Sequence, residues 1–371
     1  MRFGIEASPL RWETDGGIKR ICQHMLPELV RLLGPDHDIE YILDGDLPAS
    51  VHLDRDVHTI TGSRFHYLTR GLAHLTSKRS YDAVLVLSPF CCGVRVPVLQ
   101  LLYDLYPLRY PRMLPLTVAA DGRYWIEWTG ALVRALAAQR CRTVIAISAD
   151  TAAAFQRLHV YESCEVVVAH LGSSLAASVT EEGIRPEIAR LSRMRFLLYV
   201  GAFNIHKNVQ QVIRVFEALA TRHLDLQLVL VGHENWPWIR DFKSLINSPR
   251  IHVLSGCSDS ELATLYRSCG CFVYLSRYEG FGLPVLEAMS CGAPVVVSSE
   301  GALPEVVGHA GYLVKPHRRQ SIVDAVEASL QPAANAMLRE RSLRRSADFN
   351  WTSMAGTVAE AMLAAASSPG R

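Results

Sequence analysis

The sequence lacks several features that would place it in a specialised class of protein. No apolar run in its 371 residues approaches the roughly 18–20 residues that span a bilayer. Its nine cysteines form no CxxC pairs, which argues against a disulfide framework and against a zinc site. Lysine plus arginine (38) nearly balances aspartate plus glutamate (36), unlike the strongly basic composition of a nucleic-acid-binding protein. The composition therefore predicts a globular protein without a nucleic-acid partner.

The N-terminus also lacks the apolar segment of a signal peptide. Its first ten residues, MRFGIEASPL, lead directly into a predicted strand. Together with the unpaired cysteines, this predicts a cytoplasmic protein with reduced thiols. At about 100–200 residues per domain, the length indicates two domains.

Short β-branched strands alternate with helices along most of the chain. This alternation predicts the α/β class, with doubly wound, Rossmann-like parallel sheets. Residues 173–194 interrupt the pattern, because they are rich in Ser, Ala, Gly and Glu and contain no strand. We therefore predict a domain over 1–172, a linker over 173–194 and a second domain over 195–349. Predicted helices include 18–33, 121–141, 209–222, 238–246, 260–268, 284–290 and a final apolar helix over 352–365.

A pair of glycines follows the first predicted strand. The segment T-D-G-G-I-K-R contains Gly16 and Gly17 directly before a predicted helix. Glycines allow close approach of the backbone, and a helix N-terminus attracts anions. The segment is not a GxGxxG dinucleotide motif, and a flexible turn before a helix explains it equally well.

A richer block, S-R-Y-E-G-F-G-L-P-V-L-E-A-M-S-C-G-A-P-V-V-V, follows the strand CFVYLS. Pro284 suits the first turn of a helix, Glu287 is predicted in that same turn, and Gly292 suits the helix end. Seven residues separate Glu279 from Glu287. Carboxylates accept hydrogen bonds from sugar hydroxyls, and loop amides at a helix start can hold phosphate. The alternative is that the two carboxylates only cap the loop and favour the helix start.

This block resembles the E-x7-E signature of the family-four retaining glycosyltransferases, which have the GT-B fold. Other segments resemble the same family in the same order along the chain. They are T-D-G-G-I-K-R, YDLYPLRYP, TVIAISADT, VVVAHLG, YVGAFNIHKN, LVLVGHE, SSEGALPEVVGHAGYLVKP and FNW. The resemblance covers nearly the whole chain. It implies that the site lies between the two domains and that residues 350–371 return to the N-terminal domain.

The resemblance also implies roles for individual residues. Glu287 would bind the donor ribose, and Glu279 would lie beside the transferred sugar. Lys207 would neutralise the departing pyrophosphate, while Gly16 and Gly17 would approach the donor phosphate and the acceptor. The following residues would contact sugar and pyrophosphate: Gly280, Phe281, Gly282, Leu283, Pro284 and Val285.

Two positions depart from the family pattern. His206 stands where an Arg often precedes the Lys, and Tyr103 stands where a His usually precedes Asp104. We expect His206 and Tyr103 to contact the donor and Asp104 to be a polar catalytic group, with a structural capping role as the alternative. These departures bear on sugar identity and rate, not on the fold.

The segment over 64–79 combines basic and apolar residues, for example Arg64, Phe65, Lys78 and Arg79. Such a segment can lie on an anionic membrane, which would place the protein at the inner face of the membrane. An ordinary helix with a solvated basic face is the alternative.

The sequence and the resemblance together predict a retaining hexosyltransferase. The donor would be a nucleotide-diphosphate sugar, with GDP-mannose favoured, and the acceptor a glycan or a lipid-linked saccharide. No metal or other cofactor is expected, because no metal-ligand spacing is present. Surface polysaccharide, lipopolysaccharide or glycolipid synthesis would be its setting. A nucleotide-sugar epimerase, a dehydrogenase and a non-catalytic partner subunit of the same fold are the alternatives.

Overall fold

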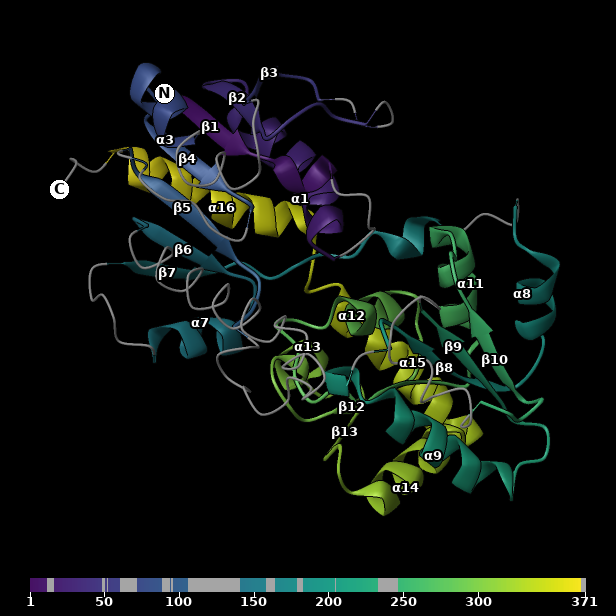
Figure 1. Cartoon of the computed structure of the whole chain (residues 1–371). Coiled ribbons are helices and arrows are strands. Elements are labelled where there is room, and N and C mark those ends of the chain that lie inside the picture. Colours follow the sequence, from purple (N-terminus) through teal and green to yellow (C-terminus); the bar gives the residue numbers. More distant parts are fainter. Residues whose placement is uncertain are drawn as a thin grey trace, which may run out of the picture. The chain divides into compact units, whose positions relative to one another are not determined.

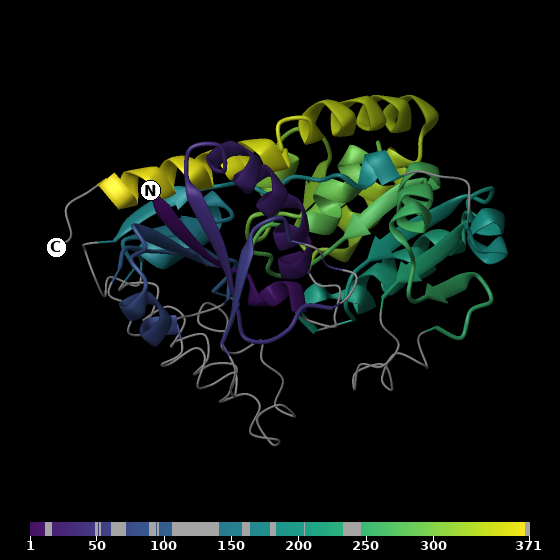
Figure 2. The ribbon, with the colours of Figure 1, turned by 90° about the horizontal axis from the view of Figure 1, so that it is seen from above.

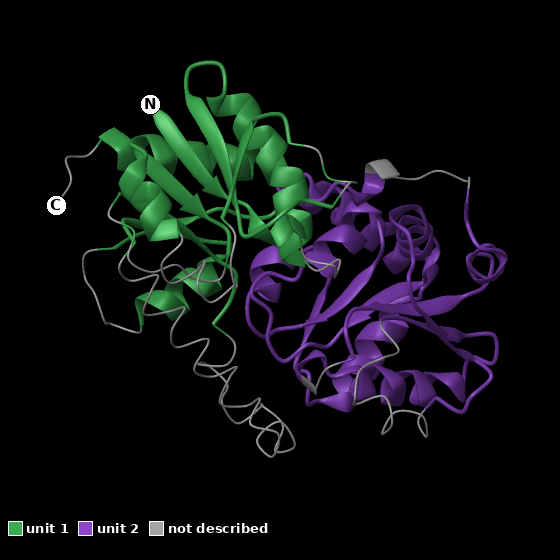
Figure 3. Ribbon diagram, turned by 45° about the horizontal axis from the view of Figure 1, so that its top comes forward, with its two compact units in different colours: residues 1–172, 350–371 green, residues 173–349 purple. Residues whose placement is uncertain are grey.

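The computed structural model describes residues 1–11, 17–48, 51, 53–60, 72–88, 94, 96–105, 141–157, 164–178, 183–203, 205–232 and 246–367. The chain forms two compact units (Figure 3). Unit 1 comprises Met1–Gly172 together with Asn350–Arg371, and unit 2 comprises Ser173–Phe349. All but the last position of the helices predicted over 121–141 and 238–246 falls outside the described residues.

Unit 1 contains a seven-stranded parallel sheet in the order β3-β2-β1-β4-β5-β6-β7. The strands are β1 (Arg2–Glu6), β2 (Asp38–Leu43), β3 (Asp56–Thr59), β4 (Ala83–Val86), β5 (Val98–Leu102), β6 (Thr143–Ala146) and β7 (Glu165–Val168). Strand order reverses between β1 and β4, where Phe3 pairs with Ala83. In such sheets ligands bind outside the carboxyl ends of the strands at this reversal.

The helices of unit 1 include α1 (Gly17–Leu33), α3 (Leu72–Lys78), α7 (Ala149–Gln156) and α16 (Trp351–Ser367), with a short 3-10 turn, η1 (Ser8–Arg11). Helix α16 lies beside α1 and crosses strands β4 to β7 (Figures 1 and 2). It buries Trp351, Met354, Val358 and Met362 almost completely. The last helix of the chain therefore contributes to the core of the first unit.

Unit 2 contains a six-stranded parallel sheet in the order β10-β9-β8-β11-β12-β13. The strands are β8 (Phe196–Val200), β9 (Gln227–Val231), β10 (Ile251–Leu254), β11 (Cys271–Tyr274), β12 (Val295–Ser298) and β13 (Tyr312–Val314). Their near-continuous apolar runs suit a sheet that is covered on both faces. Here strand order reverses between β8 and β11.

The helices of unit 2 lie on both faces of this sheet (Figure 1). Helices α9 and α14 pack against each other, as do α12 and α15. The helical elements are η4 (Leu175–Ser178), α8 (Pro186–Leu191), η5 (Ile205–Lys207), α9 (Val209–Ala220), α11 (Asp259–Ser268), α12 (Leu283–Ser290), α13 (Leu303–Val307), α14 (Arg319–Ser329) and α15 (Pro332–Ser346).

The predicted fold class, two Rossmann-like parallel α/β units, is confirmed by these sheets. The segment predicted as a linker differs from the prediction. Helix α8 begins at Pro186 within it and buries Ile188 and Leu191, and Arg185 pairs with the buried Glu261 at 2.8 Å. Most of the described part of 173–194 is therefore a folded part of unit 2, because its few apolar residues are spaced to bury one helix face.

Candidate active site

Two loops meet where the strand order of unit 2 reverses. One follows β8 and carries His206 and Lys207 in η5, and the other follows β11 and carries Glu279. Both loops lie at the carboxyl ends of their strands, which is where the ligand crevice of an open parallel sheet forms. The sheet topology thus brings together side chains that lie more than seventy positions apart in the chain.

Lys207 and Glu279 form an ion pair at this edge. The Lys207 Nζ lies 2.8 Å from Glu279 Oε1 and 2.9 Å from Oε2. The carboxylate is largely buried, and the lysine side chain is 18% exposed. Burial alone raises the pKa of Glu279, but the charge of Lys207 and hydrogen bonds from Lys207 and Tyr274 hold it below its usual value. Glu279 is therefore ionised at neutral pH.

A third side chain, Tyr274, completes this group. Its hydroxyl donates to Glu279 Oε1 at 2.8 Å and accepts from Lys207 Nζ at 3.1 Å. Burial and the neighbouring carboxylate of Glu279 raise the pKa of Tyr274 well above its usual value, so the hydroxyl keeps its proton. Sequence reasoning missed Tyr274, because a tyrosine inside CFVYLS reads as a core aromatic.

Backbone hydrogen bonds join the two loops. The carbonyl oxygen of His206 accepts from the Arg277 amide at 2.7 Å and from Ser276 Oγ at 3.2 Å. The Asn208 side chain donates to the Leu275 carbonyl oxygen at 3.1 Å. Asn208 has a left-handed backbone with φ of 56°, unusual for a residue other than glycine. These contacts fix the loops to each other independently of the ion pair.

His206 is neutral in this environment. Burial, followed by the positive charge of Lys207, lowers the pKa of His206 to about 4. Lys207, rather than His206, therefore carries the positive charge that can meet an anion at this edge.

The start of α12 differs in detail from the prediction. The helix begins at Leu283 after Gly282, which has a φ of 99°, so Glu287 lies in the second turn rather than the first. Proline fits any position of the first helical turn, because its missing amide hydrogen is not needed there, and here Pro284 is the second helical residue rather than the first. Glu287 is buried, and its charge is one of those that raise the pKa of Tyr274, after burial and Glu279.

The six loop residues from 280 to 285 are not equivalent as amide donors. Pro284 has no amide hydrogen, and the amide of Val285 donates to the Gly282 carbonyl oxygen at 2.9 Å. The Phe281 ring is buried edge-on against Phe349. The amides of Gly280 to Leu283 precede the first hydrogen bonds within α12.

Several residues predicted to contact the donor or the acceptor belong to unit 1, whose strand order reverses between β1 and β4. Gly17 is the exposed first residue of α1, whereas Gly16 lies outside the described residues. The Tyr103 hydroxyl donates to the Leu87 carbonyl oxygen at 2.8 Å, so a ligand can meet it as an acceptor without breaking that bond. Asp104 follows β5 and is half-buried.

Glu6, at the end of β1, is a buried carboxylate that the sequence reasoning did not select. It accepts from the Ser88 amide at 2.6 Å, from Ser88 Oγ at 2.9 Å and from the Ser8 amide at 3.1 Å. These bonds join the loops after β1 and β4. An acidic residue inside the apolar strand FGIEAS was the signal that could have found it.

The segment proposed for membrane contact is described only from residue 72 onward. Leu72 is buried in the core of unit 1, and Arg79 donates to Glu40 at 2.9 Å. This part therefore matches the alternative of an ordinary helix. Within the described residues, no helix has the length and apolarity to cross a membrane, and no cluster of three or more His, Cys, Asp or Glu is placed to hold a metal ion.

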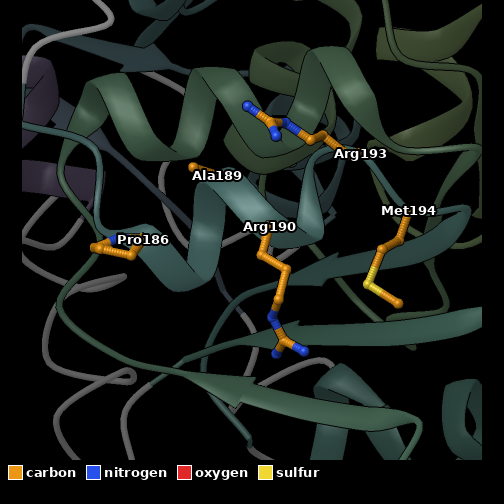
Figure 4. A pocket seen from close by; sticks show the side chains of 5 residues that line it. All are labelled: Pro186, Ala189, Arg190, Arg193 and Met194. Atoms are coloured by element: carbon orange, nitrogen blue, oxygen red, sulfur yellow. The ribbon is translucent and has the colours of Figure 1, made fainter.

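A surface cavity of about 560 Å³ lies elsewhere in unit 2. It is lined by Pro186, Ala189, Arg190, Arg193 and Met194. Met194 lies just before β8, so the cavity is at the opposite end of that strand from Lys207. The side chains of Arg190 and Arg193 point in opposite directions and do not converge on one anion (Figure 4).

The sequence of unit 2 matches a known family over residues 181–342, described as "Glycosyl transferases group 1". Over these residues the chain is similar to the group 1 glycosyl transferases. This confirms the resemblance drawn from the block between Glu279 and Glu287, which lies inside the matched segment.

The curated proteins to which the chain is similar include mannosyltransferases. The chain is 34% identical over 167 residues to the O-antigen chain mannosyltransferase B of Escherichia coli, covering 44% of each chain. It is 40% identical over 178 residues to the MMP alpha-(1->4)-mannosyltransferase of Mycolicibacterium hassiacum, covering 45% of this chain and 42% of the relative. The matches thus span less than half the length of these relatives.

Solved structures support the fold over nearly the whole chain. HepE from Anabaena, solved in complex with UDP-glucose, superposes with a TM-score of 0.72 at 18% identity, covering 98% of this chain and 99% of that chain. At this identity the comparison shows the fold alone, and that fold is GT-B.

Proposed function

We propose that this protein is a glycosyltransferase, namely a retaining hexosyltransferase that uses a nucleotide-diphosphate sugar. The acceptor is a glycan or a lipid-linked saccharide in surface polysaccharide or glycolipid synthesis. The observation that carries the proposal is the Lys207–Glu279 pair at the strand reversal of unit 2, beside the start of α12. Mannose from GDP-mannose is the donor we favour, because both curated relatives described above are mannosyltransferases.

Each part of this edge suits one part of such a donor. The buried carboxylate of Glu287 can accept hydrogen bonds from ribose hydroxyls, and the amides from Gly280 to Leu283 can meet sugar and phosphate oxygens. Glu279 lies beside the transferred sugar. For Gly16, Gly17 and Asp104 we keep the roles that the resemblance implies.

The chemical requirement is stabilisation of the departing diphosphate. Charge develops on the phosphate oxygen as the glycosidic bond breaks, and a positioned ammonium stabilises that charge most where water is excluded. Lys207 supplies this charge, since His206 is neutral. In a retaining transfer the acceptor hydroxyl enters on the face from which the phosphate leaves. The diphosphate can then take up the hydroxyl proton, and no separate general base is assigned.

The test begins with binding. Unfolding temperatures are measured with GDP-mannose, UDP-glucose and other nucleotide sugars, because a ligand that binds only the folded protein raises its stability. Glu287→Gln keeps the size of the side chain but removes its charge. We expect it to weaken donor binding about 10- to 100-fold, since a hydrogen bond to a charged group contributes about 1.5–3 kcal/mol.

Glu340→Gln is the matched control, because Glu340 is an exposed carboxylate on α15 of the same unit. Unchanged donor binding and turnover in Glu287→Gln would refute the assignment. Binding of a nucleotide sugar without transfer to any acceptor would favour the non-catalytic partner subunit. Isomerised sugar in the absence of acceptor would favour the epimerase, which the matches above do not support.

A further inference from the structure

The Lys207 ammonium is surrounded by three oxygens in this structure. Two belong to Glu279, at 2.8 and 2.9 Å, and the third is the Tyr274 hydroxyl at 3.1 Å. An ammonium has three hydrogens to donate. If Lys207 is to meet a diphosphate, as the proposed function requires, it has to give up at least part of its contact with Glu279.

That exchange creates a problem for the carboxylate. Glu279 is only 8% exposed, and a buried carboxylate that loses its counter-charge takes up a proton unless hydrogen bonds hold its charge. Burial is the first cause that lowers the pKa of His206 to about 4, and it remains when the ammonium leaves, so His206 does not replace the charge of Lys207. Glu279 therefore needs a second, uncharged donor that stays in place.

We propose that Tyr274 is a positioning residue for the transfer reaction, whose hydroxyl keeps Glu279 oriented and ionised while Lys207 turns to the diphosphate. The inference rests on the proposed function only in that Lys207 meets a phosphate. The 2.8 Å bond from Tyr274 to Glu279 does not involve Lys207, so it can persist when the ammonium leaves.

The Tyr274 ring is fixed by its neighbours rather than by the ion pair. It stacks on Tyr199 at 5.8 Å and on Phe272 at 5.7 Å, with interplanar angles of 19° and 18°. It is fully buried, and its backbone pairs with Val297 of β12. The hydroxyl position is thus set by strand and stacking geometry.

Other groups act on the same carboxylate or on the tyrosine. His206 and Lys207 reach Glu279 from η5, the charge of Glu287 acts on Tyr274 from α12, and Tyr199 lies alongside on β8. From the loop after β12, the Ala302 amide donates to the Glu279 carbonyl oxygen at 3.2 Å. Removing one hydroxyl leaves all of these in place.

The first experiment needs no nucleotide. In Lys207→Met the ammonium is absent, and the Glu279 carboxyl is titrated by carbon-13 NMR, assigned by its loss in Glu279→Gln. We expect the pKa of Glu279 to be at least one unit higher, a tenfold change in proton affinity, when Tyr274→Phe is added. Tyr266→Phe removes a hydroxyl from another fully buried tyrosine of unit 2 and should leave the titration unchanged. Equal titration in the Tyr274→Phe and Tyr266→Phe backgrounds would overturn the inference.

The second experiment keeps Lys207 and so serves if Lys207→Met does not fold. Calorimetric titration of GDP and UDP, in two buffers of different ionisation enthalpy near pH 6, counts protons taken up on binding. We expect Tyr274→Phe to take up more protons than the wild type, approaching one, because Glu279 protonates when Lys207 leaves. If Tyr274→Phe binds the nucleotide with the same proton uptake as the wild type, the inference is wrong. Failure of the wild type to bind any nucleotide contradicts the proposed function instead, and the ligand-free titration then decides the role of Tyr274.

Discussion

His206 illustrates how one residue can depart from a family pattern without adding charge. Its imidazole is held neutral by burial and by the adjacent ammonium of Lys207. Its backbone carbonyl oxygen meanwhile anchors the loop after β11 through the Arg277 amide and Ser276 Oγ. The residue thus serves the site through its backbone, and its side chain makes stability dependent on pH.

We predict that stability falls as the pH is lowered from about 6.5 to about 4. The folded-state pKa of His206, about 4, lies below the unfolded value of about 6.5, so the unfolded state binds more protons in this window. The stabilisation is fully present above pH 6.5. Unfolding temperatures of wild type and His206→Asn, measured from pH 4 to 8, should converge at the acid end.

The exposed His309 provides the control for that comparison. His309→Asn should follow the wild-type pH dependence throughout. If His206→Asn keeps the full wild-type acid sensitivity, another group is responsible for it and the neutral imidazole is not the cause.

At the residue scale, the sequence was most informative where residue type and spacing coincide. Lys207 and Glu279 were selected from their segments, and the structure places them 2.8 Å apart. Tyr274 and Glu6 were missed because Lys207 and Ser88, which they contact, lie about seventy and eighty positions away in the chain, and such proximity is a tertiary property. The partner of Tyr103, the backbone carbonyl of Leu87, was likewise not visible in the sequence.

At the scale of elements, two turns hold the Glu279 loop in place. Gly301, with φ of 62°, follows β12, and a Cβ on it would lie 2.8 Å from the Glu279 carbonyl oxygen and 2.9 Å from its amide nitrogen. Gly282, with φ of 99°, ends the same loop. The loop after β12 therefore lies directly against the backbone of the residue that pairs with Lys207.

We predict that Gly301→Ala lowers turnover about 10- to 100-fold, because a displacement of about 1 Å at a reacting group costs rates of this order. The added methyl group has to push the Glu279 backbone away. The rate is measured with the best nucleotide-sugar donor at saturating concentration, together with the unfolding temperature.

Gly256→Ala separates displacement from backbone strain. Gly256 has nearly the same φ, 60°, but a Cβ there meets no atom within 4 Å. Both variants should therefore lose similar backbone energy, while only Gly301→Ala should lose turnover. Equal turnover in the two would show that the contact with Glu279 has no catalytic effect.

Several helices with an apolar period were predicted, whereas helices with few apolar residues were among those missed. Helix α12 was expected from Pro284 onward and begins one residue earlier. Helix α15 was not predicted, because two of its three buried positions are serines, Ser342 and Ser346, beside Leu338. Helix α7 was also missed, although Ser148 caps it through the amide of Thr151. Such helices depend on hydrogen bonds and neighbours that apolar spacing does not reveal.

At the scale of the whole molecule, unit 1 is built from two separate stretches of chain. Gly172 and Asn350 mark the places where the chain leaves and re-enters it, and a side chain at Gly172 would clash with the backbone of Trp351. The sequence of α16, rich in Ala and Met, would suit either unit. The resemblance, rather than its apolar period, implied its place.

We predict that deleting residues 350–371 unfolds unit 1 and leaves unit 2 folded. Each large apolar side chain buried by α16 contributes about 1.5–3 kcal/mol, and four such residues approach the total stability of a domain, about 5–15 kcal/mol. Limited proteolysis followed by mass spectrometry should then return a resistant fragment close to 173–349. Cleavage spread evenly over both units would contradict this, and a variant lacking only residues 368–371 is the control.

The two-part construction of unit 1 has a consequence for synthesis of the protein on the ribosome. Translation proceeds from the N-terminus, so every residue of unit 2 is made before the first residue of α16. Unit 1 therefore exposes the apolar surface of α1 and β4 to β7 until α16, the last helix to be made, covers it. The first unit to be translated thus stays unfinished throughout synthesis, and that exposed surface is where a chaperone would bind.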